Sequence, residues 1–198
     1  PDSQMIWSDC YATLSLAAYH TSRIRLGTGV TIAGTRLAPV TAHSIASINK
    51  LAPGRTFLGI GTGHTAMRIM GQKPMGPSAF RDYLRAVRGL LDGEEVEYTH
   101  NGETRPIRFQ DRELDCLNLE DRVPIYVGAN GPKALAATGA FGDGRISAGT
   151  EPVSVMRSNM EKVNRGAEQA GRALPEVFHT SVLTYACVLK TGENLASD

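Results

Sequence analysis

Short apolar runs alternate with longer amphipathic segments along most of the chain. The clearest run is Thr56 to Ile60, which carries no charge and lies between Pro53-Gly54 and the glycine-rich Gly61-Thr62-Gly63. An apolar run of this length, bounded by turn residues, is typical of a buried strand. Similar runs predict further strands at 24–30, 123–127, 145–149 and 177–189.

Helical periodicity fills the intervals between these runs. The strongest pattern follows Ser78, which has the position of an N-cap, and continues to Gly93. Its apolar residues fall on one face, as in an amphipathic helix. The charged residues of the opposite face are Arg81, Asp82, Arg85 and Arg88. Further helices are predicted at 7–20, 39–51, 132–140 and 156–170, with the beginning of another at 191–198.

The alternation of strands and helices predicts an α/β protein with a parallel sheet and right-handed crossovers. An open doubly wound sheet fits this order. Part of a (β/α)₈ barrel fits it too, although a complete barrel needs about 250 residues and this chain has 198. The polar segment near 94–118 interrupts the alternation, and its Asn101-Gly102 pair predicts a hairpin. We therefore expect one domain over 1–198 with a hairpin insertion.

Composition and charge narrow the classes of function. A formal net charge of +1 does not favour nucleic-acid or membrane-surface binding. The cysteines Cys10, Cys116 and Cys187 are widely spaced and form no Cys-x-x-Cys motif, which predicts reduced thiols in a cytoplasmic protein. The five histidines lack metal-ligand spacing with a nearby carboxylate, so we expect no metal site.

The segment from Gly61 to Ala66 fits the G-x-G-x-x-A dinucleotide fingerprint by letter. The acidic residue at the expected distance, Asp82, falls in a predicted helix instead of at a strand end. Gly71 and Pro74 also shorten the helix that should follow the glycines. These features argue against an NAD-type site. His64, within the same segment, is either a functional residue or an ordinary loop histidine.

A second small-residue segment, Asn130-Gly131-Pro132-Lys133, opens a predicted helix. Free backbone amides, the helix dipole and Lys133 make such a start suitable for an anion. A plain strand–helix turn explains the same residues equally well.

Taken together, the strand ends resemble the bacterial luciferase-like superfamily of flavin-dependent oxidoreductases. The most similar pattern is that of its deazaflavin-dependent group, which includes methylene-tetrahydromethanopterin reductase. The segments that carry the resemblance are 21–30, 53–63, 123–133 and 142–144. The resemblance implies an incomplete TIM-like barrel, in which residues 1–4 end the second strand and 177–189 form the seventh.

Site residues carry over from the family by position. Gly29-Val30 matches a bulge where family members have a non-prolyl cis peptide behind the flavin ring, and Asp2 and Ser3 match contacts at the ring edge. The other implied cofactor-binding residues are Thr28, Thr62, Gly63, Gly128, Ala129, Asn130, Gly131 and Lys133.

Two positions depart from the family pattern. Many deazaflavin members have an acidic residue where His64 stands, and several have a histidine where Ser3 stands. The intrinsic pKa of histidine permits proton transfer near neutral pH, so His64 is a catalytic candidate together with Asp2.

The resemblance implies hydride transfer between a small-molecule substrate and a deazaflavin coenzyme or FMN. The alternatives are an FMN-dependent monooxygenase that activates O₂, and a catalytically inactive binding or accessory subunit of the same fold. We expect a homo-oligomer such as a dimer, with neither nucleic acid nor membrane as a partner.

Overall fold

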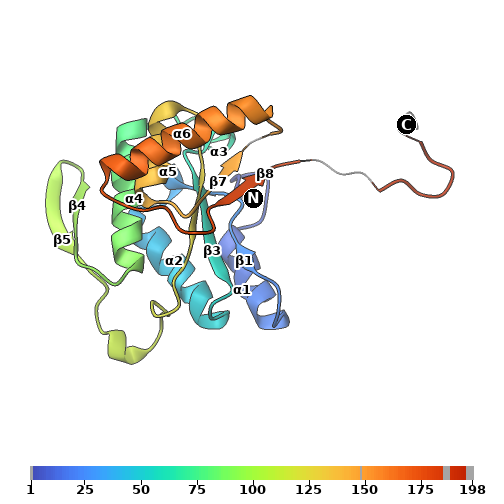
Figure 1. Cartoon of the computed structure of the whole chain (residues 1–198). Helices are drawn as coiled ribbons and strands as arrows, with labels where there is room; N and C mark the ends of the chain where they lie inside the picture. Colours follow the sequence, from blue (N-terminus) through green and yellow to red (C-terminus); the bar gives the residue numbers. More distant parts are fainter. Residues whose placement is uncertain (1, 148, 185–187, 195–198) are drawn as a thin grey trace.

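A curved parallel sheet with helices around its outer side forms half of a barrel (Figure 1). The computed structural model describes residues 2–147, 149–184 and 188–194. The strand order is β1-β3-β6-β7-β8, and β2 also pairs with β3. The strands are β1 (Leu26–Gly27), β2 (Thr31–Ile32), β3 (Thr56–Gly61), β6 (Ile125–Gly128), β7 (Gly144–Ser147) and β8 (His179–Val182). The predicted α/β class and incomplete barrel are confirmed.

The five complete helices predicted from the sequence form, with shifted ends: α1 (Cys10–His20), α2 (Ala38–Leu51), α4 (Pro77–Leu91), α5 (Pro132–Phe141) and α6 (Val153–Gln169). A short helix that was not predicted, α3 (His64–Ile69), follows β3. Helix α1 begins at Cys10 instead of residue 7 because the Asp9 carboxylate accepts hydrogen bonds from the first-turn amides. The N-cap of α4 is Gly76, so the expectation for Ser78 was wrong: Pro77 occupies the first turn and starts the helix earlier.

The strand predicted at 24–30 divides into β1 and β2, which both pair with β3. Leu26 lies opposite Thr56 and Thr31 lies opposite Ile60. Five steps along the first segment therefore match four along β3, and the extra residue is accommodated as a bulge. The bulge contains the peptide bond between Gly29 and Val30.

The carboxyl-terminal predictions are only partly met. The strand expected at 177–189 is shorter, since β8 covers His179–Val182. Residues 191 and 192 lie in a turn where a helix was expected to begin. Positions 1, 148, 185–187 and 195–198, which include Cys187, lie outside the described residues.

The hydrophobic core fills the space between the sheet and α2, α4 and α5. Leu58 of β3, Ile125 of β6 and Leu84 of α4 are fully buried in it. Arg88 was expected on the polar face of α4, and this was wrong because the side chain is only 7% exposed. Its guanidinium donates to both Asp92 carboxylate oxygens and to the Val123 carbonyl, which satisfies the buried charge.

Asp143 joins the amino-terminal ends of β6 and β7. One carboxylate oxygen accepts the Ile125 amide at 2.9 Å. The other accepts from Arg122 at 2.9 Å and from Arg172 at 2.8 Å. This buried carboxylate is therefore fully paired and ties the α6–β8 connection to the sheet.

The hairpin insertion consists of β4 (Val96–His100) and β5 (Glu103–Ile107), which pair antiparallel beside α4 (Figure 1). Asn101 and Gly102 have φ angles of 52° and 82°. Two successive positive φ values are what a two-residue hairpin turn of type I′ requires. The predicted hairpin is confirmed.

Candidate functional site

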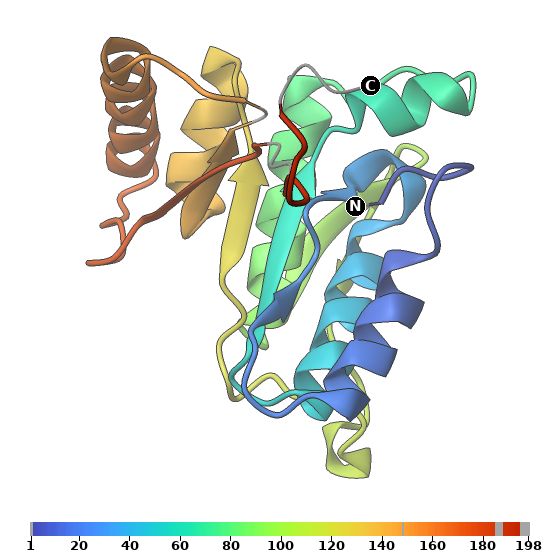
Figure 2. The same cartoon turned by 90° about the vertical axis from the view of Figure 1, so that its right-hand side faces the viewer.

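Sheet register brings the separate glycine-rich strand ends to one edge. Ile32 lies opposite Gly61, Gly61 opposite Gly128, and Gly128 opposite Ile146. Ile32, Gly61 and Gly128 end their strands and Ile146 is the last residue but one of β7, so the segments that follow meet at the carboxyl edge of the sheet (Figure 2). Parallel α/β proteins bind ligands at this edge.

The bulge between β1 and β2 lies against these strand ends. The Gly29–Val30 peptide is cis, as the resemblance implied. The Val30 side chain covers the bare backbones of Gly61 and Gly128: a Cβ at Gly61 would be 3.2 Å from Val30 Cγ2, and one at Gly128 3.8 Å from Val30 Cγ1. Among the described residues, no atom lies within 4 Å of the Cβ position of Gly29. The bulge thus leaves open backbone at the carboxyl edge of the sheet.

Thr28 holds this bulge from the inside. Its hydroxyl is buried and donates to the Gly59 carbonyl at 2.6 Å. Thr28 and Gly29 also line a cavity of about 370 Å³ beside Trp7 and α1. Thr28 therefore contributes to the site through the backbone that it positions.

The segment after β3 turns sharply into a short helix. Gly63 has φ of +81°, and a Cβ there would lie 2.2 Å from Ile32 Cγ2, so only glycine fits. His64 is the exposed first residue of α3, while the Thr62 carbonyl accepts the Met75 amide at 3.3 Å. Helix α3 has only six residues, and Asp82 lies in α4 and not at a strand end. Both features contradict the dinucleotide fingerprint.

The segment after β6 carries donors for an anionic group. Gly131 is the N-cap of α5, with no side-chain cap in the described part of the chain. No described atom lies within 4 Å of its Cβ position. Lys133 is exposed in the first turn, and the exposed Asn130 precedes the cap. Bare backbone, a helix start and an ammonium group together suit phosphate oxygens.

Both carboxylate oxygens of Asp2 accept hydrogen bonds from other residues of the chain. Asp2 is 4% exposed, and one carboxylate oxygen accepts from Thr31 Oγ1 at 2.8 Å, the Ile32 amide at 3.1 Å and Arg36 Nη1 at 2.7 Å. The other oxygen accepts from Gln4 at 2.7 Å. Asp2 therefore holds the amino-terminal segment on β2.

Ser3 lies next to this anchor and is half-buried. Its carbonyl accepts the amides of Ile6 and Trp7. Asp2 and Ser3 line a polar cavity of about 280 Å³, together with Arg36. The structure thus places both ring-edge candidates beside the carboxyl edge of the sheet.

An aromatic layer that the sequence analysis missed lies on the inner face of the sheet, towards the amino-terminal ends of the strands. Ring centroids are 5.1 Å apart for Phe57 and Tyr126, and 5.2 Å apart for Tyr126 and His179. Arg25 lies over the Phe57 ring and donates to the Tyr126 hydroxyl at 2.9 Å. Alternation along β3 and β6 was the available signal, because Phe57 and Tyr126 point away from the core residues beside them.

Arg145 and Glu151 form a second missed feature. The Arg145 side chain is 2% exposed and donates to the two Glu151 carboxylate oxygens at 2.8 and 2.6 Å. The Arg145 hydrogen bonds lower the pKa of Glu151 to about 2, and a hydrogen bond from Ser147 adds to this effect. An arginine inside an otherwise uncharged strand, with a glutamate six residues later, was the available sequence signal.

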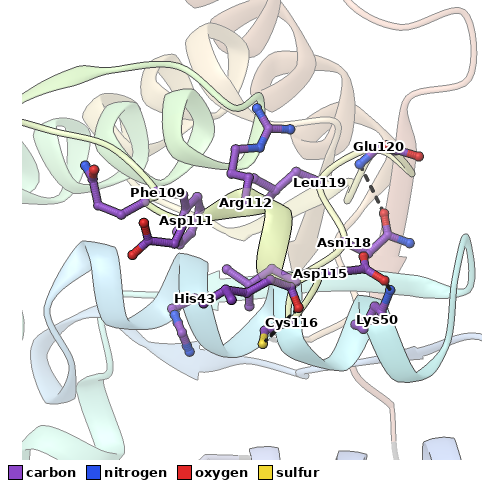
Figure 3. Close-up of a pocket in the computed structure, with 13 residues that line it drawn as sticks. His43, Lys50, Phe109, Asp111, Arg112, Asp115, Cys116, Asn118, Leu119 and Glu120 are labelled. Atoms are coloured by element: carbon purple, nitrogen blue, oxygen red, sulfur yellow. Dashed lines mark hydrogen bonds and ion pairs between the residues drawn. The ribbon is translucent and has the colours of Figure 1, made fainter.

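A further cavity, of about 380 Å³, lies between α2 and the loop at 109–120 (Figure 3). His43 and Lys50 line it from α2, and Asp115 and Cys116 line it from the loop. Lys50 and Asp115 form an ion pair across the cavity. The loop lies at the end of the sheet opposite α3 (Figure 2), so this cavity is separate from the glycine-rich strand ends.

The thiols and histidines of the described residues give no metal centre. Cys10 is buried and Cys116 is exposed, and both are free thiols. Burial raises the pKa of the Cys10 thiol to about 12. No group of three or more histidine, cysteine, aspartate and glutamate side chains in the described part of the chain is placed to hold a metal ion.

Comparison with known proteins supplies the family. The profile of the luciferase-like monooxygenases matches residues 1–196. The chain belongs to the luciferase-like monooxygenase family. It is 38% identical, over 183 residues, to 5,10-methylenetetrahydromethanopterin reductase of Methanolobus tindarius, covering 90% of this chain and 52% of that protein. It is 31% identical to F420-dependent glucose-6-phosphate dehydrogenase of Nakamurella multipartita, covering 83% of this chain and 49% of that protein.

Solved structures share the fold. The coenzyme F420-dependent tetrahydromethanopterin reductase of Methanopyrus kandleri superposes with a TM-score of 0.66 at 27% identity, covering 89% of this chain and 54% of that one. An F420-dependent secondary alcohol dehydrogenase gives a TM-score of 0.73 at 20% identity, covering 88% and 53%. The chain spans about half the length of these relatives. Among the described residues, no helix is long and apolar enough to cross a membrane.

Proposed function

We propose that this protein is an oxidoreductase that transfers hydride between a small organic substrate and a bound deazaflavin of the F420 type. The observation that carries the proposal is the Gly29–Val30 bulge, whose open backbone lies against the strand ends at Gly61 and Gly128. The names of the relatives support it, because several of them are F420-dependent reductases or dehydrogenases.

The residues present fit such a cofactor. Gly29 offers open backbone to a ring, and the Val30 side chain lies against Gly61 and Gly128. Asn130, Gly131 and Lys133 offer donors to phosphate oxygens. When bound, the deazaflavin supplies the ring carbon that accepts or donates hydride, while the protein supplies position and polar contacts.

His64 is the side chain that we assign to proton transfer. It is exposed at the carboxyl edge of the sheet, in the segment that follows the glycine-rich end of β3. Histidine is the side chain that enzymes use most often as a general acid or base. Asp2 acts instead as a positioning residue, because its carboxylate oxygens are already paired with Arg36, Thr31 and Gln4.

An FMN-dependent monooxygenase is the second candidate function. The family description favours it, and so does the shared fold of a Baeyer–Villiger monooxygenase solved in complex with FMN, at a TM-score of 0.64 and 17% identity. The same Gly29 backbone would accept either tricyclic ring. A binding or accessory subunit without activity is the third reading.

Cofactor retention separates these readings. Purified protein is incubated with F420 or with FMN, desalted, and examined by absorbance. Retained deazaflavin without FMN supports the first reading, and retained FMN alone supports the second. Loss of both overturns the two enzyme readings and leaves the accessory subunit.

We also propose a homodimer in the cytoplasm. Two free thiols, at Cys10 and Cys116, suit a reducing compartment. Light scattering should give twice the chain mass of 21.2 kDa. A monomer mass at micromolar concentration would contradict the dimer.

A further inference from the structure

Arg145 connects β7 to the segment that follows β6. Its Nε donates to the Ala129 carbonyl at 2.8 Å, and its Nη2 donates to Asn130 Oδ1 at 3.1 Å. Ala129 is 1% exposed, whereas Asn130 is exposed. One buried guanidinium therefore holds both the backbone and the side chain at the start of the candidate anion site.

This contact determines which way the Asn130 amide faces. A guanidinium has only donors, so the amide oxygen of Asn130 must face Arg145. The Asn130 NH₂ group then faces away from Arg145 and has no hydrogen-bond partner among the described residues. Two donors are thereby presented beside Gly131 and Lys133, where an acceptor-rich group would lie.

Glu151 fixes Arg145 in turn. Its carboxylate accepts hydrogen bonds from both terminal nitrogens of Arg145 and from the Ser147 hydroxyl, the last at 2.9 Å. Asn159 of α6 contacts the same carboxylate at 3.4 Å. The guanidinium is thus held from β7, from the loop after it and from α6, which leaves it little freedom to rotate.

We propose that Arg145, held by Glu151, is a positioning residue for the phosphate-bearing part of the cofactor. It acts through Asn130, whose amide it turns so that two N–H donors face a phosphate ester. This inference rests on the proposed function, because it concerns a cofactor that carries a phosphate.

Cofactor pairs that differ in the phosphate test the assignment. Dissociation constants are measured by fluorescence for FMN and riboflavin, and for F420 and its ring–ribityl portion without phosphate. The ratio for FMN and riboflavin isolates the phosphate contribution, whereas the ratio for the deazaflavin pair contains the phosphate together with the tail attached to it. In Arg145→Met this contribution should fall about tenfold, since the phosphate loses well-placed donors. The matched control is Arg172→Met, which removes an arginine from Asp143 at the other end of the sheet and should leave the ratio unchanged.

A conservative variant covers the case in which Arg145→Met does not fold. Arg145→Lys keeps the charge beside Glu151 but lacks the planar fork, so it should lower the same ratio. Asn130→Ala should lower it as well, and Arg145→Lys combined with Asn130→Ala should lower it no further. An unchanged ratio in Arg145→Lys, or additive losses, would show that Arg145 does not act through Asn130.

A titration with inorganic phosphate tests the inference independently of the proposed function. If the protein retains neither deazaflavin nor flavin, the proposed function fails. The ¹⁵N-resolved signals of the Asn130 NH₂ group can still be followed during phosphate titration. They should shift in the wild type and in Arg172→Met but not in Arg145→Lys. Absence of a shift in the wild type would overturn the inference itself.

Discussion

Asp2 and Arg36 form an ion pair of 2.7 Å whose side chains are only 2% and 16% exposed. Arg36 also pairs with Asp9 at 2.8 Å, and its guanidinium lies over the Tyr11 ring. The segment before α1 is therefore tied to the segment after β2. This arrangement accounts for the burial of Asp2 without a catalytic role.

Replacing Asp2 should reduce stability. Asp2→Asn keeps the size of the side chain but leaves Arg36 with one carboxylate in place of two. Loss of one partner of a buried ion pair costs several kcal/mol, and because Asp9 remains we expect about 3 kcal/mol. Urea unfolding measures the free energy.

The matched control for Asp2 is Asp9→Asn. The Asp9 side chain is 54% exposed, and asparagine can still cap α1. We expect a loss below about 1 kcal/mol, as for a surface ion pair. Equal losses in the two variants would contradict the expectation that the buried ion pair of Asp2 stabilises the chain more than the exposed one of Asp9.

Gly139 of α5 is required by the close contact between α5 and α6. A Cβ at this position would lie 1.9 Å from the Val163 carbonyl oxygen and 2.7 Å from the Ala167 nitrogen. Alanine normally stabilises a helix by about 1 kcal/mol relative to glycine. Here overlap with backbone atoms should dominate, and Gly139→Ala should lower stability by about 3 kcal/mol.

Gly149→Ala is the control for Gly139, because no described atom lies within 4 Å of its Cβ position. Its effect should stay within about 0.5 kcal/mol in the same thermal or urea unfolding assay. If the Gly139→Ala variant were more stable than the wild type, α5 and α6 would separate more easily than their packing indicates.

Glu151 should contribute to stability in a pH-dependent way. Its pKa is about 2 in the folded chain because of hydrogen bonds from Arg145, against an ordinary 4.5. A lowered pKa means that the contribution is complete above pH 4.5 and is lost as the pH falls towards 2. Glu151→Gln should therefore be less stable than the wild type at pH 7, and the difference should shrink at pH 3.5.

Carboxyl ¹³C shifts give a direct check on Glu151, since its titration midpoint can be read without unfolding the protein. A midpoint near the ordinary glutamate value would contradict the strong pairing with Arg145. With no difference in pKa between the folded and unfolded chain, the difference in stability between Glu151→Gln and the wild type would not change with pH.

His64→Ala tests the proton-transfer assignment. Loss of a general acid or base typically lowers turnover by about 10²–10⁴-fold. We expect a loss in this range, with the dissociation constant of the cofactor unchanged. His100→Ala, on the exposed hairpin strand β4, is the control and should leave both quantities as they are. Unchanged turnover in His64→Ala removes this residue from the mechanism.

Local sequence determined the elements whose causes lie within a few residues. Strand β3 follows from an apolar run between turn residues, the hairpin from Asn101-Gly102, and the apolar face of α4 from its periodicity. The cis peptide at Gly29–Val30 was expected only through resemblance to a family. The N-cap of α4 was misplaced because Pro77 begins the helix before Ser78.

Tertiary structure decided the environments of the charged residues and the assembly of the site. Arg88 and Arg145 are buried because Val123, Asn130 and Glu151, from other segments, accept their hydrogen bonds. Parallel pairing joins strands that are far apart in the sequence, and its register cannot be deduced from local hydrophobicity. The sequence alone therefore identified the glycine-rich strand ends, whereas only the folded sheet brought them to one edge and placed a paired arginine behind them.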